Sequence, residues 1–273
     1  MMSIYLKQFI FLCTVILFAN CQNKDKTAIN KTGETDNKWV QLFNGKDLND
    51  WVVKIKGHPA GDNYLNTFRV ENGIIKVSYD QYEKFDESYG HLFYKNPFSS
   101  YQLKVQYRFT GIQKEGGAGW AERNSGLMIH SQSPESMDLQ QNFPGTIEVQ
   151  MLGGLNKEEP RPTGNLCTPG TNVVMDGTLV TQHCTNAYSD TFYGEQWVNL
   201  EVMVIRDSII THKINGKEVL KYSKPQIGGD DLNEYPASWS DRKGELLKGG
   251  YISLQSESHP IEFRNIELLA LDL

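Results

Sequence analysis

Two segments in the middle of the chain, residues 124–132 and 145–152, alternate apolar and polar side chains with a period of two, which is typical of β-strands. If both strands lie in one sheet, one of its faces is apolar. The opposite face then carries an imidazole, a carboxylate and two amides, from His130, Gln132, Glu148 and Gln150. Held on a rigid sheet, such groups could bind or convert a polyhydroxylated ligand. Any antiparallel sandwich with a wet outer face shows the same alternation, so this pattern by itself favours a structural interpretation.

A third segment, near the C-terminus, continues the polar face. Residues 249–260 alternate again, and one side of this predicted strand carries Tyr251, Ser253, Gln255 and Glu257. In the same sheet, these side chains could extend the polar face of His130 and Glu148.

Alternating segments separated by turn residues occur along residues 38–273 and predict an all-β domain. Asn-Gly and Asp-Gly pairs mark hairpin turns at Asn72-Gly73, Asp176-Gly177 and Asn215-Gly216. Strands are expected at residues 68–77 (a hairpin), 91–94, 101–109, 172–176, 179–183, 197–204, 208–214, 217–222 and 261–269. The sequence contains no long helical pattern and no internal repeat, so it predicts a single antiparallel β-sandwich.

Three polar segments between the strands are candidates for functional loops. Residues 111–123 combine a cluster of glycines with Trp120, which favours either a mobile loop that closes over a ligand or an ordinary connection. Residues 153–192 are irregular and interrupted by prolines, and a loop of this length in a compact domain favours a functional role. In residues 223–247, Trp239 is either a sugar-stacking platform or a satellite contact of the core.

The N-terminus is typical of a targeting segment. An apolar run too short to span a membrane comfortably is followed by Cys21, which resembles a bacterial lipobox, although Phe18 and Asn20 depart from its usual residues. We therefore expect a signal peptide over residues 1–20 and lipidation of Cys21. Residues 21–37 are rich in polar residues and predict a flexible tether. A simple secretory signal is the alternative.

The four cysteines separate by position. Cys13 lies in the expected signal peptide and Cys21 at the expected lipidation site. Cys167 and Cys184 remain as an even pair in an exported chain, which predicts a disulfide. It would close a loop of roughly 17 residues and stabilise the fold by about 3 kcal/mol. A metal site made by these cysteines and His183 is the alternative, but the Cys-x-x-Cys spacing of such sites is missing.

Composition and charge narrow the class of partner. Hydrophobic residues make up 39% of the chain and aromatic residues 11%, which is enough for a large core. The formal net charge is -6 and there is no basic patch, so nucleic acid is not an expected partner. The sequence has no phosphate-binding loop, dinucleotide fingerprint, serine-hydrolase elbow or zincin motif.

Several short motifs occur in an order and spacing that resemble one family. They are residues 42–51 (LFNGKDLNDW), 124–129 (NSGLMI), 147–150 (IEVQ), 214–216 (ING), 250–255 (GYISLQ) and 263–266 (FRNI). From about Trp39 to Leu271, the chain is similar to the 3-keto-disaccharide hydrolase domain family. Many members have a simpler segment where this chain has the loop between Cys167 and Cys184, so substrate detail does not carry over.

The resemblance implies a concanavalin- or laminarinase-like jelly roll, made of two stacked antiparallel sheets, and a carbohydrate substrate oxidised to a ketone at carbon 3. The ketone acidifies the proton on carbon 2, so a general base can remove it and the glycosidic oxygen can leave from carbon 1. Addition of water then makes the net reaction a hydrolysis. A bound divalent metal could polarise the ketone, although no ligand set stands out in the sequence.

The family motifs point to candidate residues in this chain. His130 or Glu148 is the expected general base, and His183 is a second candidate acid or base. Arg123 could stabilise the enolate or another anionic oxygen. The remaining side chains expected to bind substrate are Asn124, Gln132, Gln150, Gln255, Trp120 and Trp239.

Two other functions remain open at this point. One is a non-catalytic glycan-binding lipoprotein that uses the same face of the sandwich. The other is an ordinary glycosidase, which needs two carboxylates, and Glu148 has no acidic partner two residues along the chain. In each case we expect an exported protein of the bacterial cell envelope, in the periplasm or at the cell surface, that contacts the membrane only through its lipid anchor.

Overall fold

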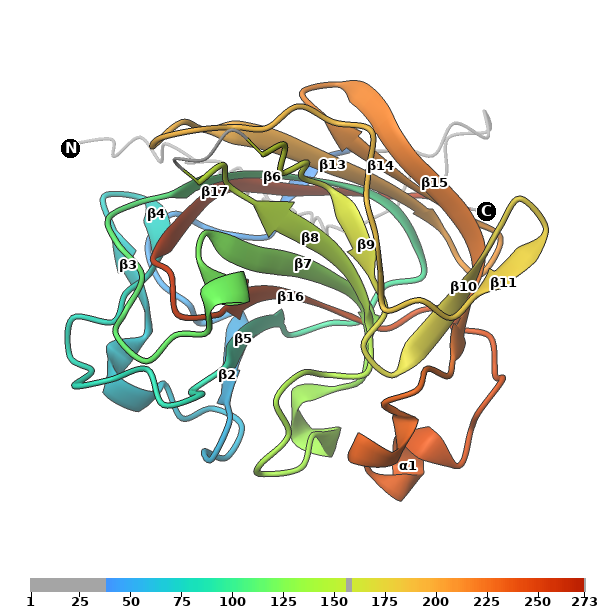
Figure 1. The fold of residues 1–273 in the computed structure, drawn as a ribbon, viewed down its shortest axis with the longest axis horizontal. Coiled ribbons are helices and arrows are strands. Elements are labelled where there is room, and N and C mark those ends of the chain that lie inside the picture. Colours follow the sequence, from blue (N-terminus) through green and yellow to red (C-terminus); the bar gives the residue numbers. More distant parts are fainter. Residues whose placement is uncertain (1–37, 156–158, 273) are drawn as a thin grey trace, which may run out of the picture. The chain divides into compact units, whose positions relative to one another are not determined.

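The computed structural model describes residues 38–155 and 159–272, which form two antiparallel β-sheets packed face to face (Figure 1). The described part of the larger sheet has ten strands, and in spatial order they are β11 (Thr178–Val180), β10 (Thr171–Met175), β15 (Lys217–Ile227), β14 (Ile209–Ile214), β13 (Val198–Ile205), β6 (Ser100–Phe109), β17 (Ile261–Ala270), β4 (Ile74–Val77) and β3 (Phe68–Glu71), with β1 (Val40–Gln41) paired to β17. This arrangement confirms the predicted all-β jelly-roll sandwich.

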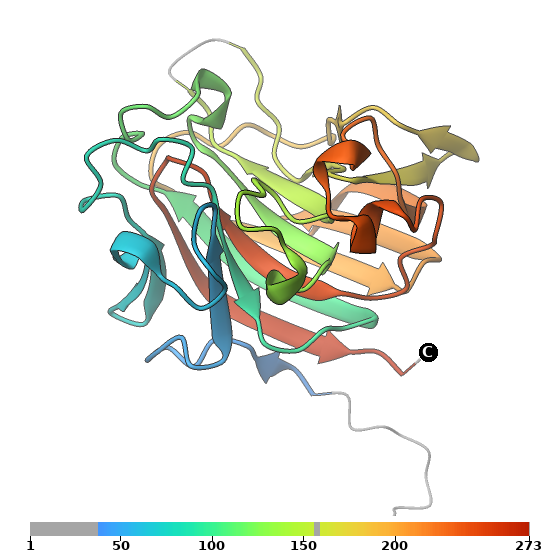
Figure 2. The same ribbon diagram turned by 90° about the horizontal axis from the view of Figure 1, so that it is seen from below.

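The smaller sheet carries the face on which the functional residues were predicted. Within the described residues its seven strands, in spatial order, are β12 (Cys184–Thr185), β9 (Asn165–Cys167), β8 (Ile147–Leu152), β7 (Asn124–Ser131), β16 (Tyr251–Ser256), β5 (Gly90–Tyr94) and β2 (Trp51–Ile55). Figure 2 views the sandwich from the side of this sheet, where loops and a short helix lie in front of the strands.

Helices are few and short in the part of the chain that the structure describes. They are the α-helix α1 (Ala237–Ser240) and four 3-10 turns, η1 (Tyr64–Asn66), η2 (Gly119–Ala121), η3 (Pro134–Ser136) and η4 (Leu232–Glu234). None of these helices is long and apolar enough to cross a membrane.

The core lies between the sheets and follows the period-two pattern. In β6, the alternate residues Leu103, Val105, Tyr107 and Phe109 are buried, as predicted. From the smaller sheet, Leu127 and Ile129 of β7 point into the same core. Each large apolar side chain buried in this way contributes roughly 1.5–3 kcal/mol of transfer free energy.

The predicted hairpin turns are confirmed. At Asn72-Gly73 and at Asn215-Gly216, both central residues have positive φ, between 48° and 81°, as a type I′ turn requires. Strand β15 is longer than predicted and runs on to Ile227, because its distal half pairs with β10. Pairing with β10 therefore makes residues 223–227, a polar segment that contains a proline, part of a strand, although the local pattern predicted a loop there.

The predicted signal peptide, the lipidation site at Cys21 and the tether lie outside the residues that the structure describes. Their assignment stays a prediction from the sequence.

Candidate functional site

A pocket of about 400 Å³ opens on the outer face of the smaller sheet. Its walls come from strands β7, β8 and β9 and from the loops around them. The lining residues are Trp120, Asn124, Phe143, Glu148, Gln150, Leu152, Arg161, Cys167, Pro169, His183, Cys184 and Glu257. A pocket of this size is large enough for a small-molecule ligand.

Glu148 lies in a space left by a glycine on the neighbouring strand. In the pairing of β7 with β8, Gly126 lies opposite Gln150, and Met128 lies opposite Glu148. A Cβ atom on Gly126 would lie 2.7 Å from Oε1 of Glu148. Gly126 therefore makes room for the carboxyl group, which gives the Asn-Ser-Gly motif a direct role in the site.

Replacing Gly126 with Ala is expected to displace the Glu148 carboxyl group, because the added methyl group would overlap it. A shift of about 1 Å at a reacting group can cost about 100-fold in rate, so we expect a loss of that order in kcat. Steady-state kinetics together with thermal unfolding test this prediction. An unchanged kcat in a folded variant would contradict it.

A second carboxyl group, that of Glu257, lies just beyond the end of β16 and also lines the pocket. Burial raises the pKa of Glu148 to about 8. Burial and the nearby charge of Glu148 raise the pKa of Glu257 well above its usual range, against the opposing effect of Arg161. Two buried carboxyl groups that repel each other hold at least one proton at neutral pH, so the pair can act as an acid and a base.

Arg161 connects the loops at one end of the pocket. Its guanidinium group donates hydrogen bonds to the backbone carbonyls of Trp120, Glu122, Arg123 and Gly153, at 2.5–3.3 Å. These bonds fix the segment that presents Trp120, whose side chain is 54% exposed at the pocket. The same guanidinium places a positive charge near Glu257.

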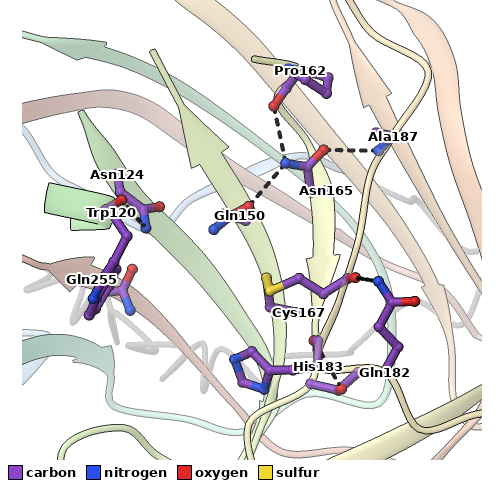
Figure 3. Close-up of a disulfide and its surroundings, with 12 residues drawn as sticks. Trp120, Asn124, Gln150, Pro162, Asn165, Cys167, Gln182, His183, Ala187 and Gln255 are labelled. Carbon is purple, nitrogen blue, oxygen red and sulfur yellow. Dashed lines mark hydrogen bonds between the residues drawn. A yellow bond between two sulfur atoms is a disulfide. The ribbon is translucent and has the colours of Figure 1, made fainter. Parts of the chain in front are cut away.

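The opposite wall contains the disulfide (Figure 3). Cys167 and Cys184 are directly paired residues of β9 and β12, with Cα atoms 4.1 Å apart, and their sulfur atoms are bonded, as predicted. The alternative of a Cys-His metal site is therefore wrong. His183 lies next to the disulfide and lines the pocket, and Gln150 accepts a hydrogen bond from Asn165.

His130 is not on the polar face with Glu148, so that part of the prediction is wrong. Its φ is 53°, and the register between β7 and β16 shifts at this point, so the strand contains a bulge. Because a bulge changes which side the next residue faces, the His130 ring turns away from the pocket. Its Nε2 atom instead makes a hydrogen bond of 2.9 Å with the backbone carbonyl of Arg206, in the turn between β13 and β14 of the larger sheet.

Arg123 and Gln132 also lie outside the pocket, contrary to prediction. Arg123 lies over the ring of Phe109 and donates a hydrogen bond to the carbonyl of Gly194. The Gln132 side chain is buried, and its Oε1 atom accepts hydrogen bonds from the Gln141 side chain and from the backbone of Gly145. These contacts give both residues a structural role.

Trp239 is not available to stack on a sugar, so the sugar-stacking alternative is wrong and the satellite contact is confirmed. Its ring is buried in a small second cluster with Ile227, Tyr235 and Leu247, and its Nε1 atom donates a hydrogen bond to the carbonyl of Gly170. Gln255 lies on the same face of the sheet as Glu257 but is buried below the pocket, and its Nε2 atom faces Oε1 of Glu257 at 3.4 Å.

The pocket thus brings together Glu148, Gln150, Asn124, Trp120 and His183 of the predicted residues. Five lining residues were not among the candidates, and three of them carry polar or aromatic side chains: Arg161, Phe143 and Glu257. Only Glu257 had a signal in the sequence, because the alternation of residues 249–260 puts it on the same face as Gln255.

Metal binding stays a prediction. In residues 38–155 and 159–272, no group of three or more His, Cys, Asp or Glu side chains is arranged to hold a metal ion. The acidic and imidazole side chains that line the pocket are those of Glu148, Glu257 and His183.

Two solved structures from Parabacteroides distasonis, both described as candidate glycosyl hydrolases, share the fold. One has a TM-score of 0.51 and 18% identity, and the match covers 86% of this chain and all of that one. The other has a TM-score of 0.52 and 18% identity, and covers 86% of this chain and 94% of that one. No curated protein sequence matches the chain.

The sequence also matches a family model, described as the 3-keto-alpha-glucoside-1,2-lyase-like domain, over residues 38–269. The match spans both sheets and every residue of the pocket. The chain therefore belongs to the 3-keto-alpha-glucoside-1,2-lyase-like domain family.

Proposed function

We propose that this protein cleaves glycosides in which the sugar carries a ketone at carbon 3. The observation that carries the proposal is the pair of buried carboxyl groups, Glu148 and Glu257, in one pocket. The family to which the chain belongs supports a carbohydrate as the ligand and a keto sugar as its class.

The pair supplies the two proton transfers that the reaction needs. One carboxylate removes the proton from carbon 2, and the released electron pair forms the bond between carbons 1 and 2 as the bond from carbon 1 to the glycosidic oxygen breaks. The other carboxyl group donates its proton to that departing oxygen. Water can then add across the new double bond, which completes a net hydrolysis. We assign these roles to the pair, because two strongly interacting carboxyl groups titrate together.

Other side chains in the pocket have roles that fit a sugar. The amide groups of Asn124 and Gln150 can hydrogen-bond to hydroxyl groups or to the enolate oxygen. The exposed ring of Trp120 can stack on the apolar face of a sugar ring. His183 lies on the far wall, where a proton carrier for the departing group or the entering water would be useful.

An ordinary glycosidase is the second candidate. The sequence did not supply an acidic partner for Glu148, but the structure brings Glu257 to it from another strand. Two carboxyl groups are the usual requirement for hydrolysis of an unoxidised glycoside. A glycan-binding protein without activity is the third candidate. Binding alone does not require a pair of buried carboxyl groups with raised pKa values.

Release of free sugar from a 3-keto-disaccharide and from its unoxidised parent separates these candidates. We expect turnover of the keto substrate only. Equal turnover of the parent would favour the ordinary glycosidase, and binding without turnover of either sugar would favour the glycan-binding protein. The same assay with a chelator tests the metal, since loss of activity that is restored by a divalent cation would establish that one is needed.

Export and lipidation complete the proposal. The apolar N-terminal run and Cys21 support a protein anchored to the cell envelope, with the carbohydrate site outside the cytoplasm. Incorporation of labelled palmitate that Cys21→Ala abolishes would support the anchor, and equal labelling of the variant would contradict it.

A further inference from the structure

A second buried imidazole, that of His91, lies on the same face of the smaller sheet as the pocket floor. In the strand next to the edge of the sheet, His91 of β5 pairs with Gln255 of β16 on one side and with Lys54 of the edge strand β2 on the other. His91 is fully buried, and Gln255 is 1% exposed. Among the described residues, neither nitrogen of His91 nor Oε1 of Gln255 has a hydrogen-bond partner.

Of the four buried histidines among the described residues, His91 and His259 have no hydrogen-bond partner for either ring nitrogen, whereas His212 has partners for both. His212, in β14, is also fully buried, but its two nitrogens bond to the carbonyl of Gly164 and to the hydroxyl of Tyr222, each at 2.8 Å. Buried polar atoms in proteins almost always have a partner, which is protein, water or ligand. The polar atoms of His91 and Gln255 that have no hydrogen-bond partner therefore indicate a place where a polar ligand group or water binds.

One aromatic side chain of the pocket lining, Phe143, packs on His91. The ring of Phe143 lies edge-on to the imidazole, with centroids 6.1 Å apart, and Phe143 is part of the pocket wall. The backbone of Phe143 is held in place, because its carbonyl accepts a hydrogen bond of 2.7 Å from Gln141, which in turn bonds to Gln132. His91 does not itself line the pocket, so a ligand could reach it only after a side chain such as that of Phe143 rotates.

We propose that His91 and Gln255 form a second carbohydrate subsite beneath Phe143, which binds hydroxyl groups of the sugar ring attached to the keto sugar. The proposal rests on the proposed function and adds where the second ring is held. In the smaller sheet, β5 is three strands away from β8. Measured across the strands, His91 therefore lies about 14 Å from the strand that carries Glu148. That distance exceeds the width of one hexose ring, so His91 lies beyond the reacting sugar. Gln255, whose Nε2 atom is 3.4 Å from Oε1 of Glu257, lies at the boundary between the two rings.

The chemistry of the two side chains fits a hydroxyl pair. Burial lowers the pKa of His91 to about 3, so the imidazole is neutral and offers one N–H donor and one nitrogen acceptor. The carbonyl oxygen of Gln255 adds a second acceptor.

His91→Leu tests the subsite, with His212→Leu as the matched control. For His91→Leu we expect KM for a 3-keto-disaccharide to rise about tenfold, through the loss of two hydrogen bonds, with little change for the methyl glycoside of the same keto sugar. Its Tm should stay the same or rise, because an apolar side chain replaces one without partners. For His212→Leu, which removes paired polar atoms, we expect Tm to fall by about 5 °C.

A selective loss for the disaccharide, with Tm maintained, supports the subsite. If wild type turns over the disaccharide and His91→Leu matches it in KM, the subsite is wrong and the proposed function stands. If wild type turns over neither substrate, the proposed function fails, and calorimetry with the unoxidised disaccharide decides the subsite. Weaker binding to His91→Leu than to wild type would then support it, and equal or undetectable binding to both would overturn it.

Phe143→Ala provides an independent readout. Carbethoxylation of His91 by diethylpyrocarbonate, followed by peptide mass spectrometry, should be faster in this variant than in wild type, and saturating disaccharide should slow it again. Modification of His91 at the same rate in both proteins, or without protection by the disaccharide, would overturn the role of Phe143 as the cover of the subsite.

Discussion

Glu257→Gln is expected to lower kcat on a 3-keto-disaccharide by about 10²- to 10⁴-fold, and Glu148→Gln by a similar factor, because each variant removes one partner of the acid–base pair. Gln keeps the shape of the side chain but can neither accept nor release a proton at neutral pH. The double variant should be little worse than either single one, since the two groups act as a unit. Single-turnover kinetics of the three variants test this expectation.

Glu262→Gln is a matched control for these variants. Glu262 is also a buried glutamate, but it lies in β17 of the larger sheet and is paired with Arg108 and Lys76, away from the pocket. Its replacement should leave kcat within about twofold of wild type. A large loss in this control, or near-normal kcat in Glu257→Gln, would contradict the assignment of the pair.

Glu148→Gln is also expected to stabilise the protein at alkaline pH. Folding raises the pKa of Glu148 from its ordinary 4.5 to about 8, so between these values the folded protein keeps a proton that the unfolded chain releases. The stability tied to this group is therefore fully present below about pH 4.5 and is lost as the pH rises through about 8. At pH 9 the loss, measured from the stability below pH 4.5, amounts to about 5 kcal/mol, which Gln does not incur.

Urea unfolding of wild type and Glu148→Gln at pH 5 and at pH 9 measures this effect. The variant should gain about 4 kcal/mol over wild type between the two pH values. Glu262→Gln, which loses ion pairs instead of relieving a buried charge, should show no such gain. Parallel pH dependence of wild type and Glu148→Gln would show that the Glu148 carboxyl group is not destabilised by burial.

The alternation of side chains was sufficient to predict the two-sheet fold and part of the site. It placed Glu148 and Gln150 on one face of β8, and the pocket contains both. The Asn-Gly turns fixed the hairpins, because only a few residues tolerate positive φ at both central positions. These features depend on local geometry, which a sequence records directly.

His130 shows where local alternation fails. One extra residue in β7 is enough to turn the ring to the other side of the sheet, and nothing in residues 124–132 marks the bulge. The bulge lies against Gly250, just before the neighbouring strand β16, where an added Cβ would come within 2.5 Å of the His130 backbone. Such a close approach of two backbones can be recognised only when the pairing of the strands is known.

The remainder of the site depends on contacts between distant segments. Arg161 comes from an irregular loop, and its role follows from four carbonyl groups in two other segments. Glu257 shares a predicted face with Gln255, but its closeness to Glu148 depends on the order of the strands in the sheet. The sequence pattern gives the face of each strand, and the topology decides which side chains meet.

Cleavage of a 3-keto-disaccharide in deuterium oxide, followed by proton nuclear magnetic resonance of the released keto sugar, tests the central claim most directly. Removal of the carbon-2 proton by the Glu148–Glu257 pair, followed by addition of solvent, predicts one deuterium at carbon 2 of every product molecule, well above the level from spontaneous exchange in buffer. Product that retains its proton at carbon 2 would show that the glycosidic bond breaks by direct displacement, and would contradict the elimination mechanism.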